Sequence, residues 1–291
     1  MNYFKRTAVV SATLFLSLMF SAHAETTFDL PGAQSAYADI DDIRMYYEIY
    51  GKGEPLLLLH GAASYISLFA YQLPELSNHF RVIAPESRGH GRTTDSAKPI
   101  SNRLMAEDFI KLMDRLKITS AYVVGWSDGG CTGLTMAYDH PERVKKLVVI
   151  GANFDSTGLQ DDTIELFRNL TPDTFPFPFL HNTYNRIAPD PAHWPVFFEK
   201  IKKNMLASIL TINQLKQIQC PTLVMVGDHD VIKMSHTVDL FEALPRGQLM
   251  VVPNASHMVP WEKPEIVNPA IITFLAGEDT KTEFFLRKKE K

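Results

Sequence analysis

The stretch "AYVVGWSDGG" (residues 121–130) places Ser127 between Gly125 and Gly129, directly after a short apolar run. The run predicts a buried strand, and the residues after it predict a helix. A serine on a sharp turn between strand and helix stands above the sheet edge, and small residues two positions to either side relieve the crowding there. Because a chain of this length contains such a pattern by chance about one time in ten, the motif needs partners elsewhere in the sequence.

Strands and helices alternate along the chain around this stretch. A β-hairpin is predicted at 36–51, strands at 55–61, 80–85, 120–126, 145–151, 220–227 and 248–253, and helices at 65–77, 101–117, 128–139, 234–244 and 264–275. Strands that alternate with helices form parallel sheets covered on both faces. The predicted fold class is therefore α/β, with a mostly parallel central sheet flanked by helices.

The alternation fails from about residue 154 to 215, where prolines and aromatic residues accumulate. We expect this segment to be a helical cap inserted over the sheet. Its aromatic residues either line an apolar pocket or pack the cap onto the sheet. The charged residues 278–291 predict a frayed tail.

The first 24 residues have the pattern of a secretory signal peptide. Lys5 and Arg6 precede an apolar run at about 8–20, and Ala22-His23-Ala24 resembles a cleavage site. The run is shorter than a typical transmembrane helix. We therefore expect an exported protein, periplasmic or secreted, cleaved after about Ala24 and without a stable membrane anchor.

The overall charge excludes one class of partner. Removal of the signal peptide would change the net charge from -4 to -6, since it takes away two basic residues and no acidic ones. An acidic chain without a concentrated basic patch argues against nucleic acid as a partner.

The two cysteines, Cys131 and Cys220, are predicted at opposite ends of the sheet and are expected to be buried free thiols.

A base and an acid are available at the predicted carboxyl edge of the sheet, where open α/β sheets bind their ligands. His257 follows the last predicted strand, and Asp228 and Asp230 follow the strand before it. A carboxylate that accepts a hydrogen bond from the imidazole fixes its tautomer and stabilises the imidazolium. Asp230 is the preferred acid because it lies one step further past the strand end, while Asp228 is expected to stabilise the turn.

Attack on a carbonyl also needs N–H donors for the oxyanion. The backbone of Asp128, at the start of a helix, supplies one. The loop after 55–61 is expected to supply the other from Ala62, with His60 and Gly61 shaping that loop, although a plain strand–loop–helix connection has the same pattern.

Together these motifs resemble the α/β-hydrolase superfamily, in the branch of serine esterases and lactonases with a small cap. The matching residues are "HG" (60–61), "RGHG" (88–91), "GWSDGG" (125–130), "GDHD" (227–230) and "SH" (256–257), in the order nucleophile, acid, base. The resemblance implies Ser127 as nucleophile, His257 as general base and Asp230 as its orienting acid. Glu86 departs from the Asp that many relatives carry, which affects loop packing.

The predicted reaction is hydrolysis of a small-molecule carboxylic ester or lactone, with no cofactor or metal and no prediction of oligomeric state. Residues expected to contact the substrate are His60, Trp126, Asp128, Phe179 and Trp194. Asp128 either pairs with a substrate amine or only favours the helix N-terminus electrostatically. If it pairs with an amine, amino-acid esters and amino-sugar macrolactones become candidates, the latter implying resistance to an antibiotic. A C–C bond hydrolase and a non-catalytic binding module of the same fold are the alternatives.

Overall fold

The computed structural model describes residues 32–277. The predicted signal peptide (1–24) and tail (278–291) lie outside the described residues. Within them the strands are β1 (Gln34–Ile40), β2 (Ile43–Tyr50), β3 (Pro55–Leu59), β4 (Arg81–Pro85), β5 (Ala121–Trp126), β6 (Val144–Ile150), β7 (Thr222–Gly227) and β8 (Gly247–Val252). They form one sheet in the order β1-β2-β4-β3-β5-β6-β7-β8.

The sheet is mostly parallel, which confirms the predicted fold class. β1 pairs with β2 and β2 with β4 in antiparallel register, and every other pairing is parallel. The central strands are buried on both faces, so they read as continuous apolar runs: Leu56–Leu59 of β3 is entirely buried.

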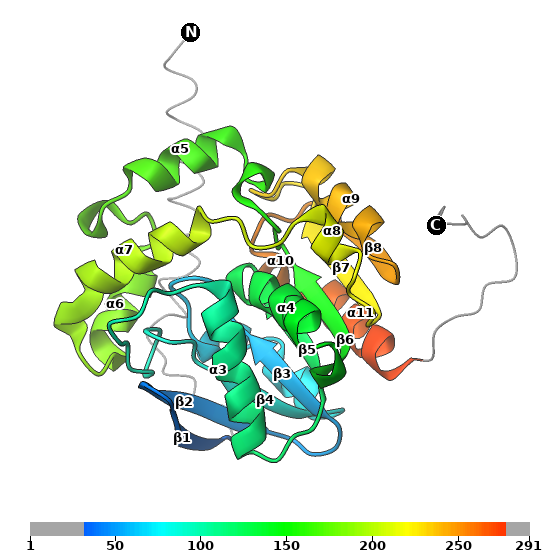
Figure 1. Ribbon diagram of the computed structural model, residues 1–291, viewed down its shortest axis with the longest axis horizontal. Coiled ribbons are helices and arrows are strands. Elements are labelled where there is room, and N and C mark those ends of the chain that lie inside the picture. Colours follow the sequence, from blue (N-terminus) through cyan, green and yellow to red (C-terminus); the bar gives the residue numbers. More distant parts are fainter. Residues whose placement is uncertain (1–31, 278–291) are drawn as a thin grey trace, which may run out of the picture.

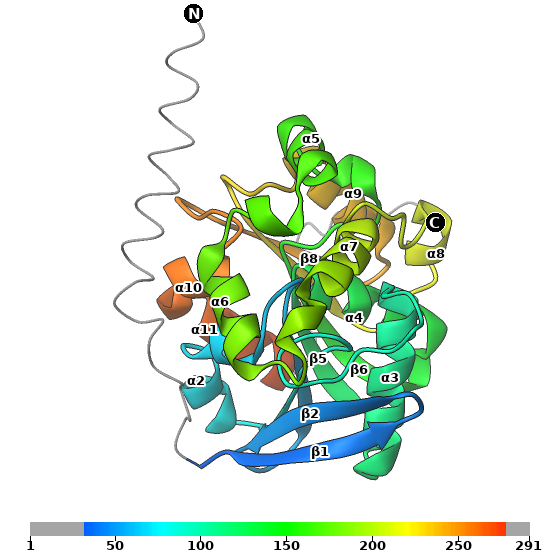
Figure 2. The same cartoon turned by 90° about the vertical axis from the view of Figure 1, so that its left-hand side faces the viewer.

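Helices cover both faces of the sheet (Figure 2). One face carries α2 (Leu73–Ser77), α10 (Val259–Glu262) and α11 (Pro264–Ala276), and the other carries α3 (Asn102–Arg115) and α4 (Asp128–Asp139). α9 (Met234–Ala243) lies beside β7 and β8, and α8 (Ile212–Leu215) packs against α9 and α4. The helix predicted at 65–77 is instead a 3-10 turn (Ile66–Phe69) followed by α2, because Pro74 lacks the N–H that a continuous helix would need.

The inserted segment between β6 and β7 is helical, with α5 (Asp161–Asn169), α6 (Pro178–Ile187) and α7 (Trp194–Met205). In Figure 1, α5 lies at the top of the molecule, and α6 and α7 lie at the left, above β1 and β2. Trp194, Phe197 and Phe198 are buried among other aromatic rings of the segment and the loops beneath it. Most of the aromatic residues therefore pack the cap rather than line a pocket.

Three further features concern residues 32–277 only. No helix there is long and apolar enough to cross a membrane, and no cluster of His, Cys, Asp and Glu is arranged to hold a metal ion. Both cysteines are free thiols, but Cys220 is only partly buried because it lies just before β7, whereas Cys131 is buried in α4.

Candidate active site

Ser127 lies on a strained turn between β5 and α4. Its backbone adopts φ 55° and ψ -121°, a region that residues with a side chain rarely occupy. Ser127 N–H donates to the carbonyl of Ile150 (2.8 Å), and its own carbonyl accepts the N–H groups of Gly130 and Cys131. A Cβ on Gly129 would overlap the carbonyl of Leu59, so the turn requires a glycine at this position.

His257 joins Ser127 to Asp230 in one hydrogen-bonded chain. Its Nδ1 lies 2.8 Å from Asp230 Oδ1, and its Nε2 lies 2.9 Å from Ser127 Oγ. Because an ionised carboxylate only accepts, Nδ1 carries the proton, and Nε2 is free to accept the Ser127 hydroxyl proton. Burial acts to lower the pKa of His257, but the charge and hydrogen bond of Asp230, together with the charge of Glu262, raise it above the usual value.

The structure brings Asp230, rather than Asp228, to the imidazole. The Asp230 side chain is fully buried and also accepts the N–H of Ile232 (3.0 Å). Asp228 is partly exposed, contacts His229 and accepts the N–H of Ala255 (3.1 Å). Asp228 thus stabilises the turn at the end of β7, as expected.

The loop after β3 runs directly against the nucleophile. A Cβ on Gly61 would lie 3.2 Å from Cβ of Ser127, and Ala63 adopts a left-handed φ of 55°. Ala62 lies between them, so its N–H belongs to a backbone segment adjacent to Ser127. Asp128 is the first residue of α4, where helical N–H groups lack intrahelical acceptors. The two predicted oxyanion donors therefore come from segments that meet at Ser127.

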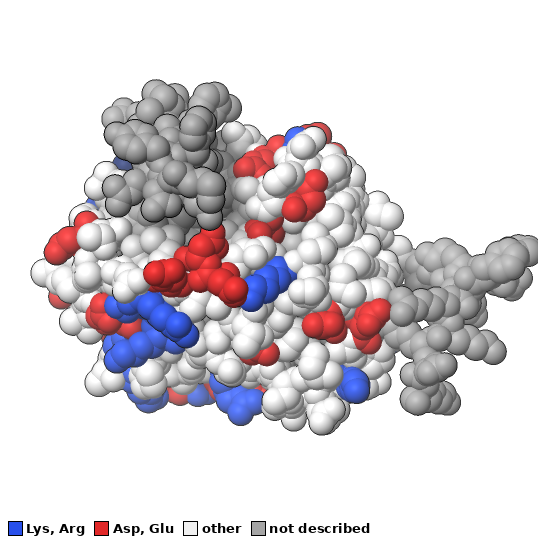
Figure 3. Space-filling view, turned by 90° about the horizontal axis from the view of Figure 1, so that it is seen from above, with Lys and Arg blue, Asp and Glu red and all other residues white. Residues whose placement is uncertain are grey.

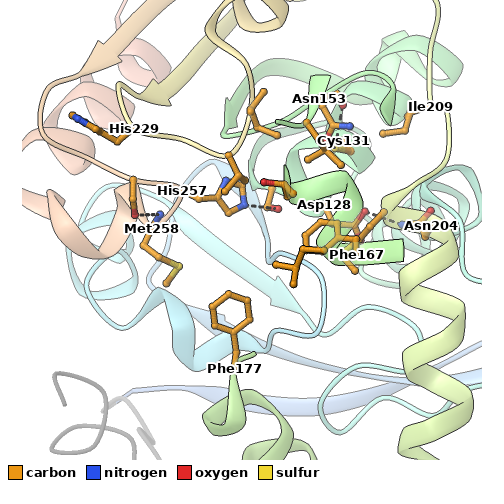
Figure 4. Close-up of a pocket in the computed structure, with 18 residues that line it drawn as sticks. Asp128, Cys131, Asn153, Phe167, Phe177, Asn204, Ile209, His229, His257 and Met258 are labelled. Atoms are coloured by element: carbon orange, nitrogen blue, oxygen red, sulfur yellow. Dashed lines mark hydrogen bonds between the residues drawn. The ribbon is translucent and has the colours of Figure 1, made fainter. Parts of the chain in front are cut away.

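The Asp128 carboxylate is the polar group nearest in sequence to the nucleophile, and it is held by two amides. Its Oδ1 accepts Asn102 Nδ2 (2.7 Å) and Asn204 Nδ2 (2.8 Å), the second coming from cap helix α7. Burial raises the pKa of Asp128 to about 6, although both hydrogen bonds favour its ionised form. The carboxylate therefore connects core and cap at the cavity wall (Figure 4).

A cavity of about 290 Å³ opens beside Ser127. Its apolar lining comes from the cap and from the loops after β7 and β8, and comprises Leu159, Leu166, Phe167, Phe177, Met205, Ile209, Val231, Ile232 and Met258. Its open side is marked by the exposed side chains of Leu166, Phe177 and His229. Phe167 and Phe177 face the space next to His257 in Figure 4. The face seen from above carries acidic and basic side chains in small groups (Figure 3).

Four residues predicted to contact the substrate do not line this cavity. His60 is buried and tethers two loops, donating from Nδ1 to the Gly61 carbonyl and accepting the Ser87 N–H at Nε2. Burial lowers its pKa to about 4 and keeps it neutral. Trp126 is buried beneath the site, and its Nε1–H donates to the His257 carbonyl (2.8 Å).

The two predicted cap residues have similar outcomes. Trp194 is buried in the aromatic interior of the cap and donates to the Pro172 carbonyl (3.2 Å). Phe179 packs partly buried against the core, and Phe177, two residues earlier, lines the cavity instead. Asn204 was not predicted at all, because its helix packs over the site only through the tertiary fold.

A hydroxyl, an imidazole and a buried carboxylate at the carboxyl edge of a parallel sheet, beneath a helical cap, define a hydrolase. The chain belongs to the alpha/beta hydrolase fold family, whose sequence model matches residues 54–218, more than half of the chain.

Its relatives carry names that refer to different substrates. The chain is 29% identical over 258 residues to carbamate hydrolase RutD of a Caulobacter species, covering 80% of this chain and 96% of the relative. It is 24% identical over 267 residues to 2-hydroxy-6-oxo-6-phenylhexa-2,4-dienoate hydrolase of Burkholderia cepacia, covering 82% and 93%. The structure is similar to carboxylesterase CesB of Bacillus subtilis, with a TM-score of 0.72, 23% identity, and coverage of 90% and 99%.

Proposed function

We propose that this protein is an exported serine hydrolase that cleaves a carboxylic ester or a lactone through an acyl-enzyme. The observation that carries the proposal is the hydrogen-bonded chain from Ser127 through His257 to Asp230 at the edge of a mainly apolar cavity. The strained backbone of Ser127 adds support, because strain of this kind gathers at functional sites.

The geometry leads to a two-stage mechanism. His257 Nε2 takes the Ser127 proton as Oγ attacks the acyl carbonyl, and the N–H groups of Ala62 and Asp128 stabilise the oxyanion. The imidazolium returns the proton to the departing alkoxide, which leaves as an alcohol. Water then attacks the acyl-serine while His257 takes its proton and passes it to Oγ, and the carboxylic acid departs. Asp230 holds Nδ1–H throughout.

A C–C bond hydrolase is the alternative that the Burkholderia relative favours. Both reactions can use the same three side chains, so the site geometry supports either. The signal-peptide pattern supports the ester proposal, because hydrolases of ring-cleavage products usually act in the cytoplasm.

A second candidate is an ester whose substrate carries an amine, including an amino-sugar macrolactone. The supporting observation is that Asp128 presents a partly buried carboxylate at the cavity wall, with both amide donors on Oδ1. A cation beside Asp128 would offset the burial that raises its pKa. The cavity is small for a macrolactone, so most of such a ring would extend past the open side at Leu166 and Phe177.

The test is hydrolysis of p-nitrophenyl esters of increasing chain length by wild type and Ser127→Ala, with labelling by a serine-directed phosphonate. Ser127-dependent release and labelling support the ester proposal. Labelling without turnover of any ester favours the binding module, and turnover of a vinylogous diketone alone favours C–C hydrolysis. Tylosin that gains the mass of one water only with Ser127 intact supports the macrolactone candidate. Export is tested by fractionation of cells that express the full chain and a chain without residues 1–24.

A further inference from the structure

The segment that leads from β6 into cap helix α5 is paired with the loop that follows the acid. Leu159 forms an antiparallel bridge with Ile232. On either side, Gln160 N–H donates to the Val231 carbonyl (2.8 Å) and Lys233 N–H donates to the Gly158 carbonyl (2.7 Å). We call Gly158–Gln160 the cap strap. It attaches α5 to the loop 231–233 by backbone hydrogen bonds.

The same loop holds the Asp230 carboxylate. Ile232 N–H donates to Asp230 Oδ1 (3.0 Å), the oxygen that also accepts His257 Nδ1–H. The other oxygen, Oδ2, is buried and has no hydrogen-bond partner among residues 32–277. The orientation of the acid therefore depends strongly on where Ile232 lies.

Both sides of this pairing also face the cavity. One wall is lined by Leu159 of the cap strap and by three residues of α5, Thr163, Leu166 and Phe167. The adjoining wall is lined by Val231 and Ile232. A molecule that fills the cavity would contact the cap and the acid loop at once. The side chain of Lys233 adds a contact outside the cavity, to Asp161 Oδ1 (2.7 Å) at the start of α5.

We propose that the cap strap is a positioning element that couples the seating of α5 over the substrate to the orientation of Asp230 against His257. Gln160 and Ile232 act through their backbone N–H groups as positioning residues, and neither takes part in the chemical steps. This inference rests on the proposed function, because it assigns the strap a role in the same triad.

The sharpest test removes one N–H from the cap strap. Gln160 has φ -59° and ψ 147°, and Leu159 before it has φ -74° and ψ 149°, so both backbones are compatible with proline at 160. Gln160→Pro deletes the hydrogen bond to Val231 and keeps the Gln160 carbonyl, which accepts the N–H of Ile164. Gln160→Ala is the matched control, because it removes the side chain and retains the N–H.

We expect Gln160→Pro to lower kcat/KM by at least roughly threefold, because it removes one hydrogen bond and places the proline Cδ against the Val231 carbonyl that accepted it. We also expect the acid limb of its pH profile to move to lower pH, because a less well-held Asp230 raises the pKa of His257 less. Gln160→Ala should match wild type in both respects. An unchanged acid limb in Gln160→Pro, or an equal change in both variants, would overturn the proposal.

A second pair of variants guards against misfolding of Gln160→Pro, which thermal melting would reveal. Asp161→Asn removes the contact with Lys233, and Asp162→Asn makes the same charge change next to it without that contact. The acid limb should move down in Asp161→Asn and by less in Asp162→Asn, and equal shifts would contradict the coupling. Ester hydrolysis that survives Ser127→Ala would instead remove the proposed function, so the two failures are distinguishable.

Discussion

The partly buried carboxyl of Asp128 leads to a prediction about stability that is independent of the substrate. In Asp128→Asn the new amide oxygen can accept the same hydrogen bonds from Asn102 and Asn204. The wild-type carboxyl has its pKa raised from 3.8 to about 6. At about 1.4 kcal/mol per pH unit, its ionisation in the folded state costs at most about 3 kcal/mol of stability. The variant does not have this cost.

The direction of the pH dependence follows from the difference in the pKa of Asp128 between the folded and unfolded states. The folded-state pKa of Asp128 lies above the unfolded one. Below about pH 4 the carboxyl is protonated in both states, so the wild type does not have the cost of ionisation. As the pH rises through about 6 the carboxyl ionises in the folded state, and the wild type loses the corresponding stability. We therefore expect Asp128→Asn to be more stable than wild type by up to about 3 kcal/mol at pH 8, and the two proteins to converge near pH 4. Urea unfolding followed by tryptophan fluorescence at both values measures the difference.

Asp161→Asn is the matched control, since its carboxylate is exposed and its pKa is lowered rather than raised. It should show no gain in stability at pH 8. If Asp128→Asn were no more stable than wild type at pH 8, or if its advantage persisted at pH 4, the argument from carboxylate burial would be refuted. Activity adds a second readout: the variant should keep its turnover of neutral esters and lose a preference for amine-bearing ones.

Three further predictions concern the triad and its supports. Asp230→Asn should lower kcat by about 10³-fold or more, because the amide permits the wrong imidazole tautomer. Initial rates of ester hydrolysis measure this decrease. For wild type, kcat/KM should decrease as the pH is lowered, because His257 must be neutral to act as the base. Since the pKa of His257 is raised, the midpoint of this decrease should lie above the usual histidine pKa. A midpoint at or below pH 6.5 would contradict this assignment. Trp126→Phe should reduce kcat by at least roughly threefold, because it removes the N–H that holds the His257 carbonyl and also shrinks a buried ring beneath the site. An unchanged kcat would show that this bond does not position the base.

The order and type of the main elements could be predicted from the sequence because they depend on local patterns. The apolar run Leu56–Leu59 indicates a buried strand, and the glycines around Ser127 indicate a crowded turn. Both patterns are local and can be recognised in the sequence. Asp230 and His257 could be selected because residues after parallel strands meet at one edge of a sheet. The break between residues 69 and 73 was missed, although Pro74 was its local signal.

The walls of the cavity depended on tertiary structure. Phe177 lines it while Phe179 packs elsewhere, and Trp194 lies inside the cap, although all three belong to one aromatic-rich stretch. Which of them faces the substrate depends on how the cap helices rotate and dock, and no periodic pattern records that.

The sequence by itself therefore determined the sheet, the turn that carries Ser127, and the edge where the base and the acid would lie. Only the tertiary structure decided that Asn204 would reach Asp128 from the cap and that the cap strap would pair with the loop holding Asp230. The physical reason is range: strands, helices and turns follow from the chemistry of neighbouring residues, whereas these contacts join residues some 70 positions apart.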